Sequence, residues 1–432
     1  MDFYNFVSFI GIFAFMFAAW LFSNNHKIIN WRVVIWGVIF QLIFAFIIFR
    51  FPAGVGFFNY VNNIVIRIFA FAKEGIYFLF GPLAISPGIK GPNGEESIGF
   101  ILAIQALPTI IFFSSLMALL YHIGFMQMIV SVFSKLFARL MKISGAESLC
   151  SASNIFVGIE SMLTIRPYIE TMTKSEFCTI LTAGMATVAS TVLGIYVSFL
   201  QDTFPTIAGH LISASILSAP AAIVMSKLIF PETEKPKTMG EHIKGEYLSS
   251  SNWIEAIIRG ANEGVRLCVG ICALLLAFLG LLAMVNGALL GVGKLFHLEL
   301  SLQGILAYLF KPLAFFCGIA PEDVNLISKL FGERAIVTEM VAYQHLAEYI
   351  REGLILYPRS VVIASYILCG FSHIASLAIF VGGTAALAPK RAREIASLGF
   401  RALFAATLAC LMTGAVAGIF FYSNQTVILI PR

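Results

Sequence analysis

Apolar stretches separated by short polar loops recur along the whole chain, which favours helices that cross a membrane. A helix rises about 1.5 Å per residue, so about 20 apolar residues span the hydrocarbon core. Eight stretches meet this length: 3–24, 32–51, 99–122, 176–200, 206–230, 265–291, 359–387 and 399–422. With 59% hydrophobic and 12% charged residues among 432, the composition excludes a soluble domain. We therefore expect an all-α polytopic membrane protein with eight transmembrane helices.

Three segments do not fit this count of spanning helices. Residues 125–143 alternate apolar and basic positions at helical spacing, which predicts one amphipathic helix at the membrane interface. Residues 146–172 and 302–350 are apolar runs interrupted by Gly, Pro and charged residues. Such runs are tolerated in a membrane only where they line a cavity, so they are predicted to be re-entrant hairpins.

Basic residues follow the first, third, fifth and seventh predicted helices. They are Lys27, Arg32, Lys135, Arg139, Lys142, Lys235, Lys237, Lys244, Lys390, Arg391 and Arg393. All these loops fall on one side, which is then cytoplasmic, and both termini are predicted to be extracytoplasmic. The N-terminal segment lacks a basic region and a small-residue cleavage site, so we expect a spanning helix there and not a cleaved signal. The basic residues thus indicate topology in a cytoplasmic (inner) membrane and not a nucleic-acid partner.

The two hairpins enter from opposite sides, and each is followed by two spanning helices. This predicts an inverted repeat, an arrangement that places binding sites near mid-membrane. The expected units are 1–143 (scaffold helices 1–3 and the interfacial helix), 144–230 (first repeat half), 231–254 (polar cytoplasmic linker), 255–300 (long scaffold helix 6) and 301–432 (second repeat half).

Two glutamates lie inside these apolar hairpins, Glu160 in the first and Glu339 in the second. A carboxylate in hydrocarbon is costly unless a partner or ligand is present, so each marks a candidate binding site. Structural interpretations remain open: Glu160 could pair with a nearby Lys or Arg, and Glu339 could pair with Arg334 five residues earlier. That spacing is off the shared helical face, which makes the second pair imperfect.

The sequence around Asn154 breaks the first hairpin and exposes backbone carbonyls. These carbonyls and the Asn154 amide oxygen are a plausible Na⁺ site, since Na⁺ prefers hard oxygen ligands. Thr187 and Val188, in the following predicted helix, could complete it, although small hydroxyl residues in membrane helices also serve close packing. His373 and Ser376 lie one turn apart on one helical face, near Phe371, which can stack on a ring. His373 is either structural or a group that couples transport to H⁺.

Other chemistry is excluded by what the sequence lacks. It has no phosphate-binding Gly-Lys-Ser/Thr loop, no Ser/His/Asp nucleophile motif and no His/Cys metal cluster. The seven cysteines are scattered through apolar runs without ligand spacing. We therefore expect no enzyme activity and no cofactor.

The motifs, taken together and in order, resemble the concentrative nucleoside transporter family over nearly the whole chain. NIFVG, RPY and TMTKSE resemble the first family hairpin and its exit, and FPETE resembles the cytoplasmic signature after the fifth helix. EMVAY is similar to the family's Glu-Phe-Val-Ala-Tyr, and CGFSHIASLAI to its Cys-Gly-Phe-Ala-Asn run. The resemblance implies a homotrimer in the lipid bilayer, with elevator-like movement of a transport domain.

The resemblance also implies site residues. It implies a nucleobase contact at Glu160 and its neighbours Gly158, Ile159 and Ser161, and a ribose contact at Glu339. It adds Phe371, His373 and Ser376 to the substrate site. It implies a sodium site at Asn154, Val157, Thr187 and Val188, with Thr187 in place of a family Ser.

The chain departs from the family pattern where the base is read. The family's Gly-Gln-Thr-Glu-Ala-Pro corresponds here to Gly158-Ile159-Glu160-Ser161-Met162, His373 replaces an Asn that binds ribose, and Thr338 replaces a second Asn. Losing matched hydrogen bonds in a buried site changes selectivity. We expect a Na⁺-coupled nucleoside importer with altered base recognition. The alternatives are an H⁺-coupled permease for nucleosides or related heterocyclic solutes, and a sensor that binds nucleoside without translocating it.

Overall fold

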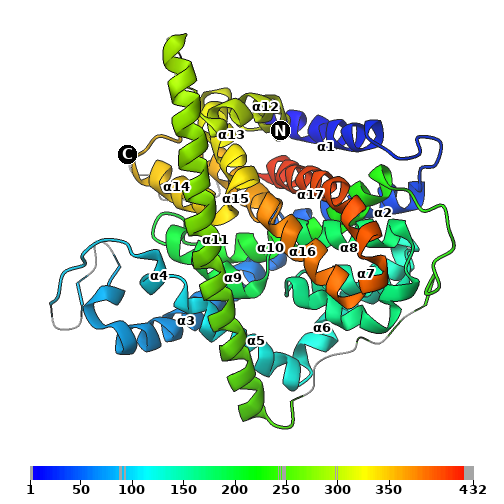
Figure 1. Ribbon diagram of the computed structural model, residues 1–432, viewed down its shortest axis with the longest axis horizontal. Coiled ribbons are helices and arrows are strands. Elements are labelled where there is room, and N and C mark those ends of the chain that lie inside the picture. The colour runs from blue at the N-terminus through cyan, green and yellow to red at the C-terminus, as the bar shows by residue number, and fades with distance from the viewer. Residues whose placement is uncertain are drawn as a thin grey trace.

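The structure is a computed structural model that describes residues 3–86, 90–91, 94–241, 243, 245, 250–296, 298 and 300–422. The described chain is helical, and its only extended pairings are two isolated bridges (Figure 1). This confirms the predicted all-α fold class.

The N-terminal part is built from six α-helices and one 3₁₀ helix. They are α1 (Phe3–Leu21), α2 (Trp31–Phe49), α3 (Pro52–Phe80), η1 (Gly81–Ala84), α4 (Leu102–Gln105), α5 (Pro108–His122) and α6 (Phe125–Met141). The predicted interfacial segment corresponds to α6. The 29-residue helix α3 was not predicted, because its apolar positions are interrupted by polar and charged residues. It lies crosswise to the long helix α11 (Trp253–Leu295) in Figure 1.

The two repeat halves contain the hairpins and the remaining helices. The first half is α7 (Gly145–Ser153), η2 (Ile159–Thr171), α8 (Lys174–Ala186), α9 (Ser190–Leu200) and α10 (Ile207–Ile229). After α11, the second half is α12 (Leu302–Phe316), α13 (Pro321–Ile336), α14 (Glu339–Arg351), α15 (Pro358–Leu368), α16 (Ile374–Leu387), η3 (Pro389–Arg391) and α17 (Ala392–Phe420).

The second hairpin is shorter than predicted. Its arms are α13 and α14, while α12 is a separate helix that packs on α13 and α1. Among the described residues, seven segments are long and apolar enough to cross a membrane. The remaining predicted span, 359–387, is helical but divided into α15 and α16, and the predicted span 176–200 is likewise divided into α8 and α9. The structure therefore places helices in all eight predicted spans.

Packing between the halves follows the predicted inverted symmetry. Helix α8 packs on α10 in the first half, and α15 packs on α17 in the second. Across the halves, α9 packs on the second arm of hairpin 2 (α14), and α16 packs on the second arm of hairpin 1 (η2). The second piece of each broken helix thus supports the other half's hairpin.

Helix α11 packs chiefly on α5 and α12. Two glycines of α11 allow its close approach to α5. A Cβ added at Gly260 would lie 2.5 Å from the Ser114 carbonyl oxygen, and one added at Gly264 would lie 2.6 Å from the Ile111 Cα. Most of the remaining α11 surface is exposed and apolar, so this helix faces lipid or another subunit.

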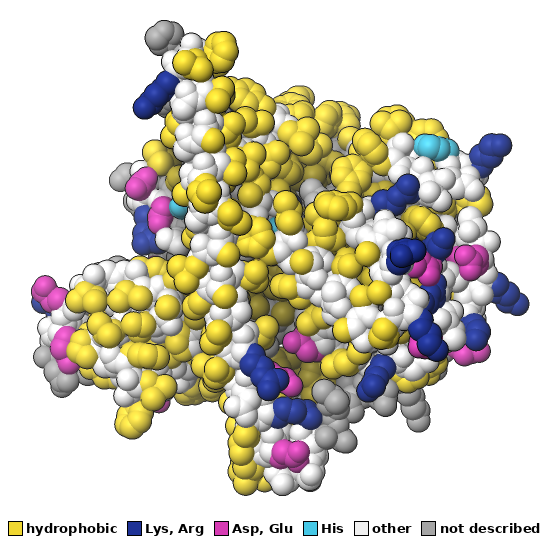
Figure 2. All heavy atoms as spheres, viewed as in Figure 1, with side chains coloured by type: hydrophobic (Ala, Val, Ile, Leu, Met, Phe, Trp, Pro, Cys, Tyr) yellow, Lys and Arg dark blue, Asp and Glu magenta, His cyan; other side chains and the backbone are white. Residues whose placement is uncertain are grey.

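The basic loops gather at one end of the molecule. Arg32 donates hydrogen bonds to the carbonyls of Arg139 and Leu140, the Asn24 amide bonds to Ile229, and Arg391 bonds to Met172. Figure 2 shows most Lys and Arg side chains of this face toward its right and lower edges. Of the basic residues used to predict topology, Lys244 lies outside the described residues. The opposite end carries the start of α1 and the end of α17, joined by Asn5, whose amide donates to Ile419 and Phe421.

Candidate functional site

The centre of the site is the point where two broken helices meet. Helix α8 ends at Ala186 and α9 begins at Ser190, while α15 ends at Leu368 and α16 begins at Ile374. Gly370, in the second break, packs against the first: a Cβ there would lie 2.6 Å from the Ala186 carbonyl oxygen and would also overlap Cys410 Sγ. Only glycine fits this contact. The breaks therefore bring four helix ends together inside the fold.

Each hairpin contacts α9. At hairpin 1, the Ser190 amide donates to the Phe156 carbonyl at 2.9 Å. At hairpin 2, the Tyr196 hydroxyl donates to Glu339 Oε1 at 2.6 Å. The Tyr196 ring also stacks on Tyr343, with ring centroids 4.5 Å apart. Helix α9 thus links the two hairpins across the site.

Glu339 is buried and held by two donors. Besides Tyr196, it contacts His373, whose Nε2 lies 2.9 Å from Oε2. His373 is the N-cap of α16, and its Nδ1 accepts a hydrogen bond from the Ser376 amide at 3.2 Å. Because Nδ1 is an acceptor, the ring hydrogen lies on Nε2 and points at the carboxylate. Arg334 is not the partner of Glu339, so the structural pairing left open by the sequence is wrong.

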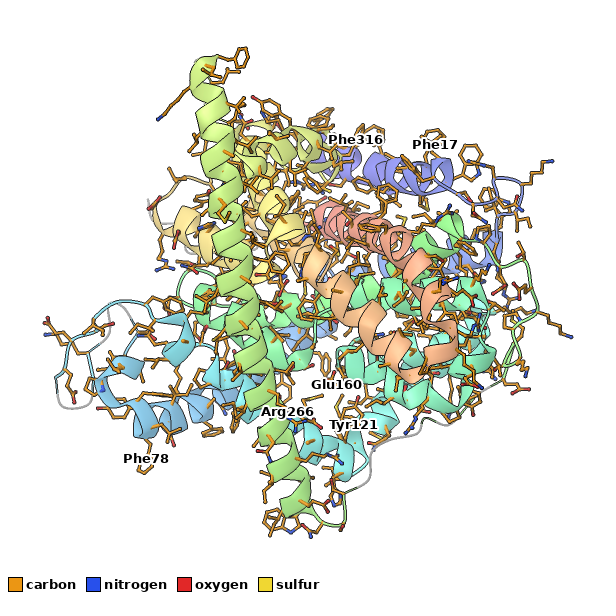
Figure 3. All side chains as sticks on the ribbon, in the orientation of Figure 1. Phe17, Phe78, Tyr121, Glu160, Arg266 and Phe316 are labelled. Carbon is orange, nitrogen blue, oxygen red and sulfur yellow. The ribbon has the colours of Figure 1, made fainter. Side chains whose placement is uncertain are left out.

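Glu160 is different, because no Lys or Arg of the described chain lies within ion-pair distance of it. It lies in the first turn of the 3₁₀ segment η2 and is partly exposed. Figure 3 places it beside α11, on the side of α16 and near Tyr121. Its carboxylate is free of the cationic partner that would have made it structural.

One cavity collects most of the predicted substrate residues. Its lining includes seven of the eight: Gly158, Ile159, Glu160, Glu339, Phe371, His373 and Ser376. Ser161 is turned away, and its hydroxyl donates to Asn154 Oδ1 at 2.9 Å. Thr338 also lines the cavity, and its buried hydroxyl has no hydrogen-bond partner within the described part of the chain. Thr338 is therefore a further candidate for contact with a ligand.

Helix α11 forms the opposite wall of this cavity with Leu267, Ile271, Leu274 and Leu275. Sequence reasoning missed these residues, because leucine and isoleucine in an apolar helix carry no chemical signal. A second cavity continues from Glu160 between α5 and α11, toward Arg259 and Glu263 near the start of α11. The site therefore lies between the repeat halves and α11, and it extends toward the end of the molecule that carries the basic loops.

The predicted sodium residues lie at hairpin 1 and the α8–α9 break, which are in contact through Phe156 and Ser190. Asn154 is fully buried at the end of α7. Of the described donors, none bonds the backbone carbonyls of Val157, Thr187 or Val188. The Thr187 hydroxyl donates to the Ala183 carbonyl at 2.8 Å. Unpaired carbonyls and an amide oxygen are neutral oxygen ligands of the kind that suits a monovalent cation.

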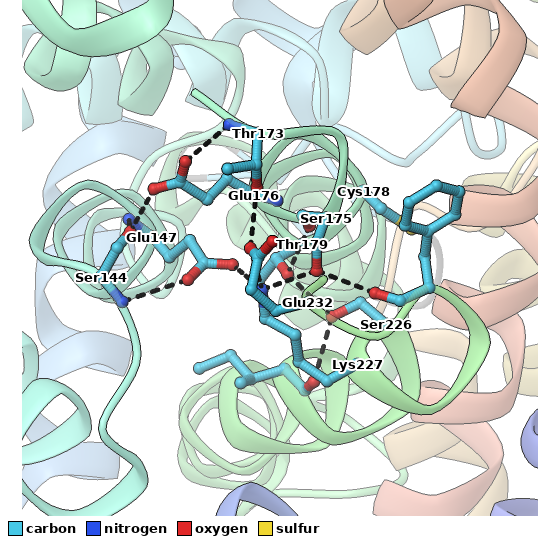
Figure 4. Close-up of polar contacts among 12 residues, drawn as sticks. Ser144, Glu147, Thr173, Ser175, Glu176, Cys178, Thr179, Ser226, Lys227 and Glu232 are labelled. Carbon is cyan, nitrogen blue, oxygen red and sulfur yellow. Dashed lines mark hydrogen bonds and ion pairs between the residues drawn. The ribbon is translucent and has the colours of Figure 1, made fainter. Parts of the chain in front are cut away.

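A buried ionic network fixes the outer ends of these helices (Figure 4). Lys227 of α10 forms an ion pair with Glu147 of α7, lies 3.7 Å from Glu232 of the linker and donates to Ser175 of α8. Glu176 accepts a 2.5 Å hydrogen bond from Ser144. Glu147 and Glu176 also complete the capping boxes that begin α7 and α8. The linker is thus packed onto hairpin 1, which its polar sequence did not indicate.

Known families match this chain throughout its length. A family described as "Na+ dependent nucleoside transporter C-terminus" matches residues 210–418, its N-terminal counterpart matches 10–83, and "Nucleoside recognition" matches 103–203. An "uncharacterized transporter" of Haemophilus influenzae is 36% identical over 418 residues, which cover 96% of this chain and 97% of that protein. The chain belongs to the concentrative nucleoside transporter family. The predicted resemblance is confirmed, and the family consists of transporters and not enzymes.

Relatives within the concentrative nucleoside transporter family include longer proteins. Mouse "Solute carrier family 28 member 3" is 39% identical over 430 residues, which cover 96% of this chain but 59% of the mouse protein. Two solved structures share the fold. CNTnw in an inward-facing substrate-bound state has a TM-score of 0.87 at 35% identity, covering 96% of this chain and 98% of that one. A variant of CNTnw in an outward-facing state has a TM-score of 0.88 at 34% identity, covering 98% and 99%.

The departures from the concentrative nucleoside transporter pattern lie in this cavity. Ile159 packs on α16, since a Cβ added at Gly383 would lie 2.8 Å from Ile159 Cγ1. An apolar side chain thus stands where the family pattern has a hydrogen-bonding Gln. Thr338 directly precedes Glu339 in sequence, His373 contacts the Glu339 carboxylate from α16, and both line the same cavity. All three substituted positions therefore line the candidate substrate cavity.

Proposed function

We propose that this chain is a secondary active transporter that imports nucleosides across the cytoplasmic membrane, driven by an inward Na⁺ gradient. The observation that carries the proposal is the shared cavity at the meeting point of the two breaks. It contains Glu160 and Glu339, one from each repeat half, together with Phe371 and His373. Two carboxylates in one cavity, with no Lys or Arg of the described residues paired to either, suit a neutral ligand rich in hydrogen-bond donors.

A nucleoside has such donors at both ends. Base N–H groups would bond Glu160, while ribose hydroxyls would bond Glu339 and the free Thr338 hydroxyl. Phe371 would stack on the base, as aromatic side chains do on bases elsewhere. Tyr196 and His373 hold the Glu339 carboxylate in one orientation before the ligand arrives. Apolar Ile159 would favour recognition of the base by shape and stacking over a donor–acceptor pattern.

Sodium would enter at the oxygens of Asn154, Val157, Thr187 and Val188. These residues lie on hairpin 1 and at the α8–α9 break, so a cation bound by them would hold the hairpin tip against α9. Since Gly158 and Glu160 follow this tip directly, an ordered tip would also fix the base-binding carboxylate. Ion binding would thereby raise the affinity for substrate, which is the coupling a symporter requires.

Sodium is favoured over H⁺ as the coupling ion by the setting of His373. Its Nδ1 accepts the Ser376 amide and its Nε2 already faces Glu339. A second ring proton would have to displace the amide bond and break the cap of α16. The neutral ring therefore fits the geometry, and it orients Glu339 without carrying a proton through the cycle.

Transport would proceed by an elevator-like movement of the two repeat halves along α11 and α5. The α11 wall of the cavity consists of apolar side chains, among them Leu267, Ile271 and Leu274, so it offers no hydrogen bond that would hold the repeat halves in one position. The second cavity leads from Glu160 toward the basic end, which the positive-inside rule assigns to the cytoplasm. We infer that this conformation is open inward, with both termini extracytoplasmic.

We also propose a homotrimer, because the family resemblance implies one and because α11 presents an exposed apolar surface. Leu276, Met284 and Leu295 on this helix are each more than 70% exposed, so the isolated chain leaves a long apolar surface. No cofactor other than the coupling ion takes part in the proposal.

Purified protein in liposomes tests the function directly. Uptake of radiolabelled uridine and adenosine is measured with an inward Na⁺ gradient, with a pH gradient alone, and with neither. Accumulation that needs Na⁺ supports the proposal. Accumulation driven by pH alone identifies an H⁺-coupled permease, and nucleoside binding without uptake identifies a sensor; either result overturns the proposal.

A further inference from the structure

Arg334 is the largest fully buried side chain of the described protein, and its charge has no carboxylate partner. It lies in α13, the first arm of hairpin 2, and is 0% exposed. Its Nη1 donates to the Ile367 carbonyl at 2.5 Å, while Nε and Nη2 have no hydrogen-bond partner among the described residues. Glu333 beside it pairs with His345 instead. An uncompensated buried charge is costly, so another feature must stabilise it.

That feature is the end of a broken helix. Ile367 lies in the last turn of α15, which ends at Leu368 before the break. The last carbonyls of a helix lack intrahelical partners and carry the negative end of its dipole, which favours a cation. Hairpin 2 supplies a second donor at the same turn, since the Tyr343 hydroxyl bonds the Ser365 carbonyl at 2.5 Å. Arg334 and Tyr343 thus tie both arms of hairpin 2 to the end of α15.

The first repeat half has no such cation. Its corresponding arm, α7, reads GAESLCSAS and contains no Lys or Arg. Instead, Asn154 lies at the end of α7 and Thr187 lies at the end of α8, and both are proposed sodium residues. The two halves can therefore be compared at the same position, which is where the first hairpin arm (α7 or α13) meets the end of the helix before the break (α8 or α15). It holds free oxygens in the first half and a guanidinium in the second.

We propose that Arg334 is a tethered cation, which does permanently in hairpin 2 what a bound Na⁺ does transiently in hairpin 1. This rests on the proposed function, since it takes the sodium site of the first half as given. Arg334 acts as a positioning residue: it fixes hairpin 2 against α15, and so fixes Glu339 at the start of α14 for the ligand. Because one cation is built in, only hairpin 1 is left free to respond to the ion gradient.

Three substitutions separate charge from shape. Arg334→Lys keeps the charge, Arg334→Gln keeps donors and stem without the charge, and Arg334→Ala leaves space for a small cation. Lys329→Gln is the matched control, because Lys329 is an exposed cation on the same helix. We expect Na⁺-driven uptake to stay within about threefold of wild type for Arg334→Lys and to fall at least about tenfold for Arg334→Gln.

Chemical rescue tests the same idea with a second readout. Guanidinium at about 10 mM is expected to restore part of the uptake of Arg334→Ala and to raise its thermal unfolding midpoint by several degrees, by mass action. It should do neither for wild type or for Asn154→Ala. Wild-type uptake by Arg334→Gln would overturn the proposal, as would an Arg334→Ala protein that folds but gains no stability from guanidinium. The thermal unfolding measurement does not depend on transport. It therefore tests the role of Arg334 even if the wild-type protein does not import nucleosides and the proposed function is wrong.

Discussion

The imidazole Nε2 of His373 lies 2.9 Å from Oε2 of Glu339, while Nδ1 of the same ring accepts the amide that begins α16. One side chain thus caps a half-helix and orients a carboxylate of the candidate site. The cap fixes the ring, and the ring in turn fixes the carboxylate. The contact occupies an oxygen of Glu339 that a ribose hydroxyl could otherwise use.

The substitution His373→Asn tests whether His373 occupies an oxygen of Glu339 that the ligand would otherwise use. Asn is an equally good N-cap, so α16 should still begin at the same residue. The shorter side chain should no longer reach Oε2, which frees one acceptor for the ligand. We expect the KM for uridine to fall several-fold while the KM for a 3′-deoxy analogue changes little, since a hydrogen bond to a charged group contributes about 1.5–3 kcal/mol. Equal changes for both substrates would contradict the role given to His373.

The two glutamates should differ in how their substitution affects stability. Glu160→Gln alters a carboxylate that has no Lys or Arg of the described residues within ion-pair distance, so uptake should fall about 10- to 100-fold while the thermal unfolding midpoint stays unchanged. Glu339→Gln should lower both, because Tyr196 and His373 donate to different oxygens of Glu339, and the NH2 group of Gln would meet one of these donors with another donor.

Exposed glutamates on the same elements provide the controls. Glu170→Gln on η2 and Glu352→Gln at the end of α14 change charge without touching the cavity, and both should transport like wild type. Uptake and thermal unfolding are measured on the same preparations. Wild-type uptake by Glu160→Gln would remove the base-binding role proposed for this residue.

The sequence predicted the polar part of the site because polar residues are conspicuous in apolar helices. Glu160, Glu339 and His373 could each be recognised in this way, and seven of the eight predicted substrate residues line one cavity. Their partners could not be read from the sequence. The guanidinium of Arg334 bonds a backbone carbonyl 33 residues away, and no pattern in the chain identifies which carbonyl that is.

The limits of the fold prediction have similar physical causes. Helix α3 was missed because Arg67, Lys73 and Glu74 interrupt its apolar face. Helix α12 was merged with the second hairpin, since Pro312 inside it resembles a hairpin break. The break between α15 and α16 lies in a long, mainly apolar stretch, and Gly370, Ser372 and His373 are the local signals of it. Spanning length and loop charge are properties of composition and were predictable, whereas close contacts depend on tertiary packing.

Gly370→Ala should disrupt the meeting point of the two breaks. The new Cβ would overlap Cys410 Sγ and the Ala186 carbonyl, and the backbone oxygen cannot rotate away. We expect a loss of about 1–3 kcal/mol in the free energy of unfolding, with loss of uptake. Gly382→Ala on α16 is the control, because its Cβ would meet open space and a helical Ala stabilises by about 0.5–1 kcal/mol. Similar thermal midpoints for the two variants would show that the breaks do not pack as described.

The buried network around Lys227 should be essential for stability and not for recognition. Lys227→Met leaves Glu147 without its cation, and Glu176 and Glu232 lie in the same network. Removing one partner of a buried pair costs about 3–5 kcal/mol, so most of the protein should fail to fold. Adding Glu147→Gln removes the uncompensated charge and should recover part of that loss.

The control for this network is Lys235→Met, which removes an exposed cation from the linker and should leave folding unchanged. Thermal unfolding in detergent gives the stability, and uptake by the folded fraction gives the function. Because the network lies at the ends of α7, α8 and α10, away from the substrate cavity, the double variant should keep the KM of wild type. A changed KM in folded protein would mean that the network also positions hairpin 1 for the ligand, and the separation of stability from recognition would then be wrong.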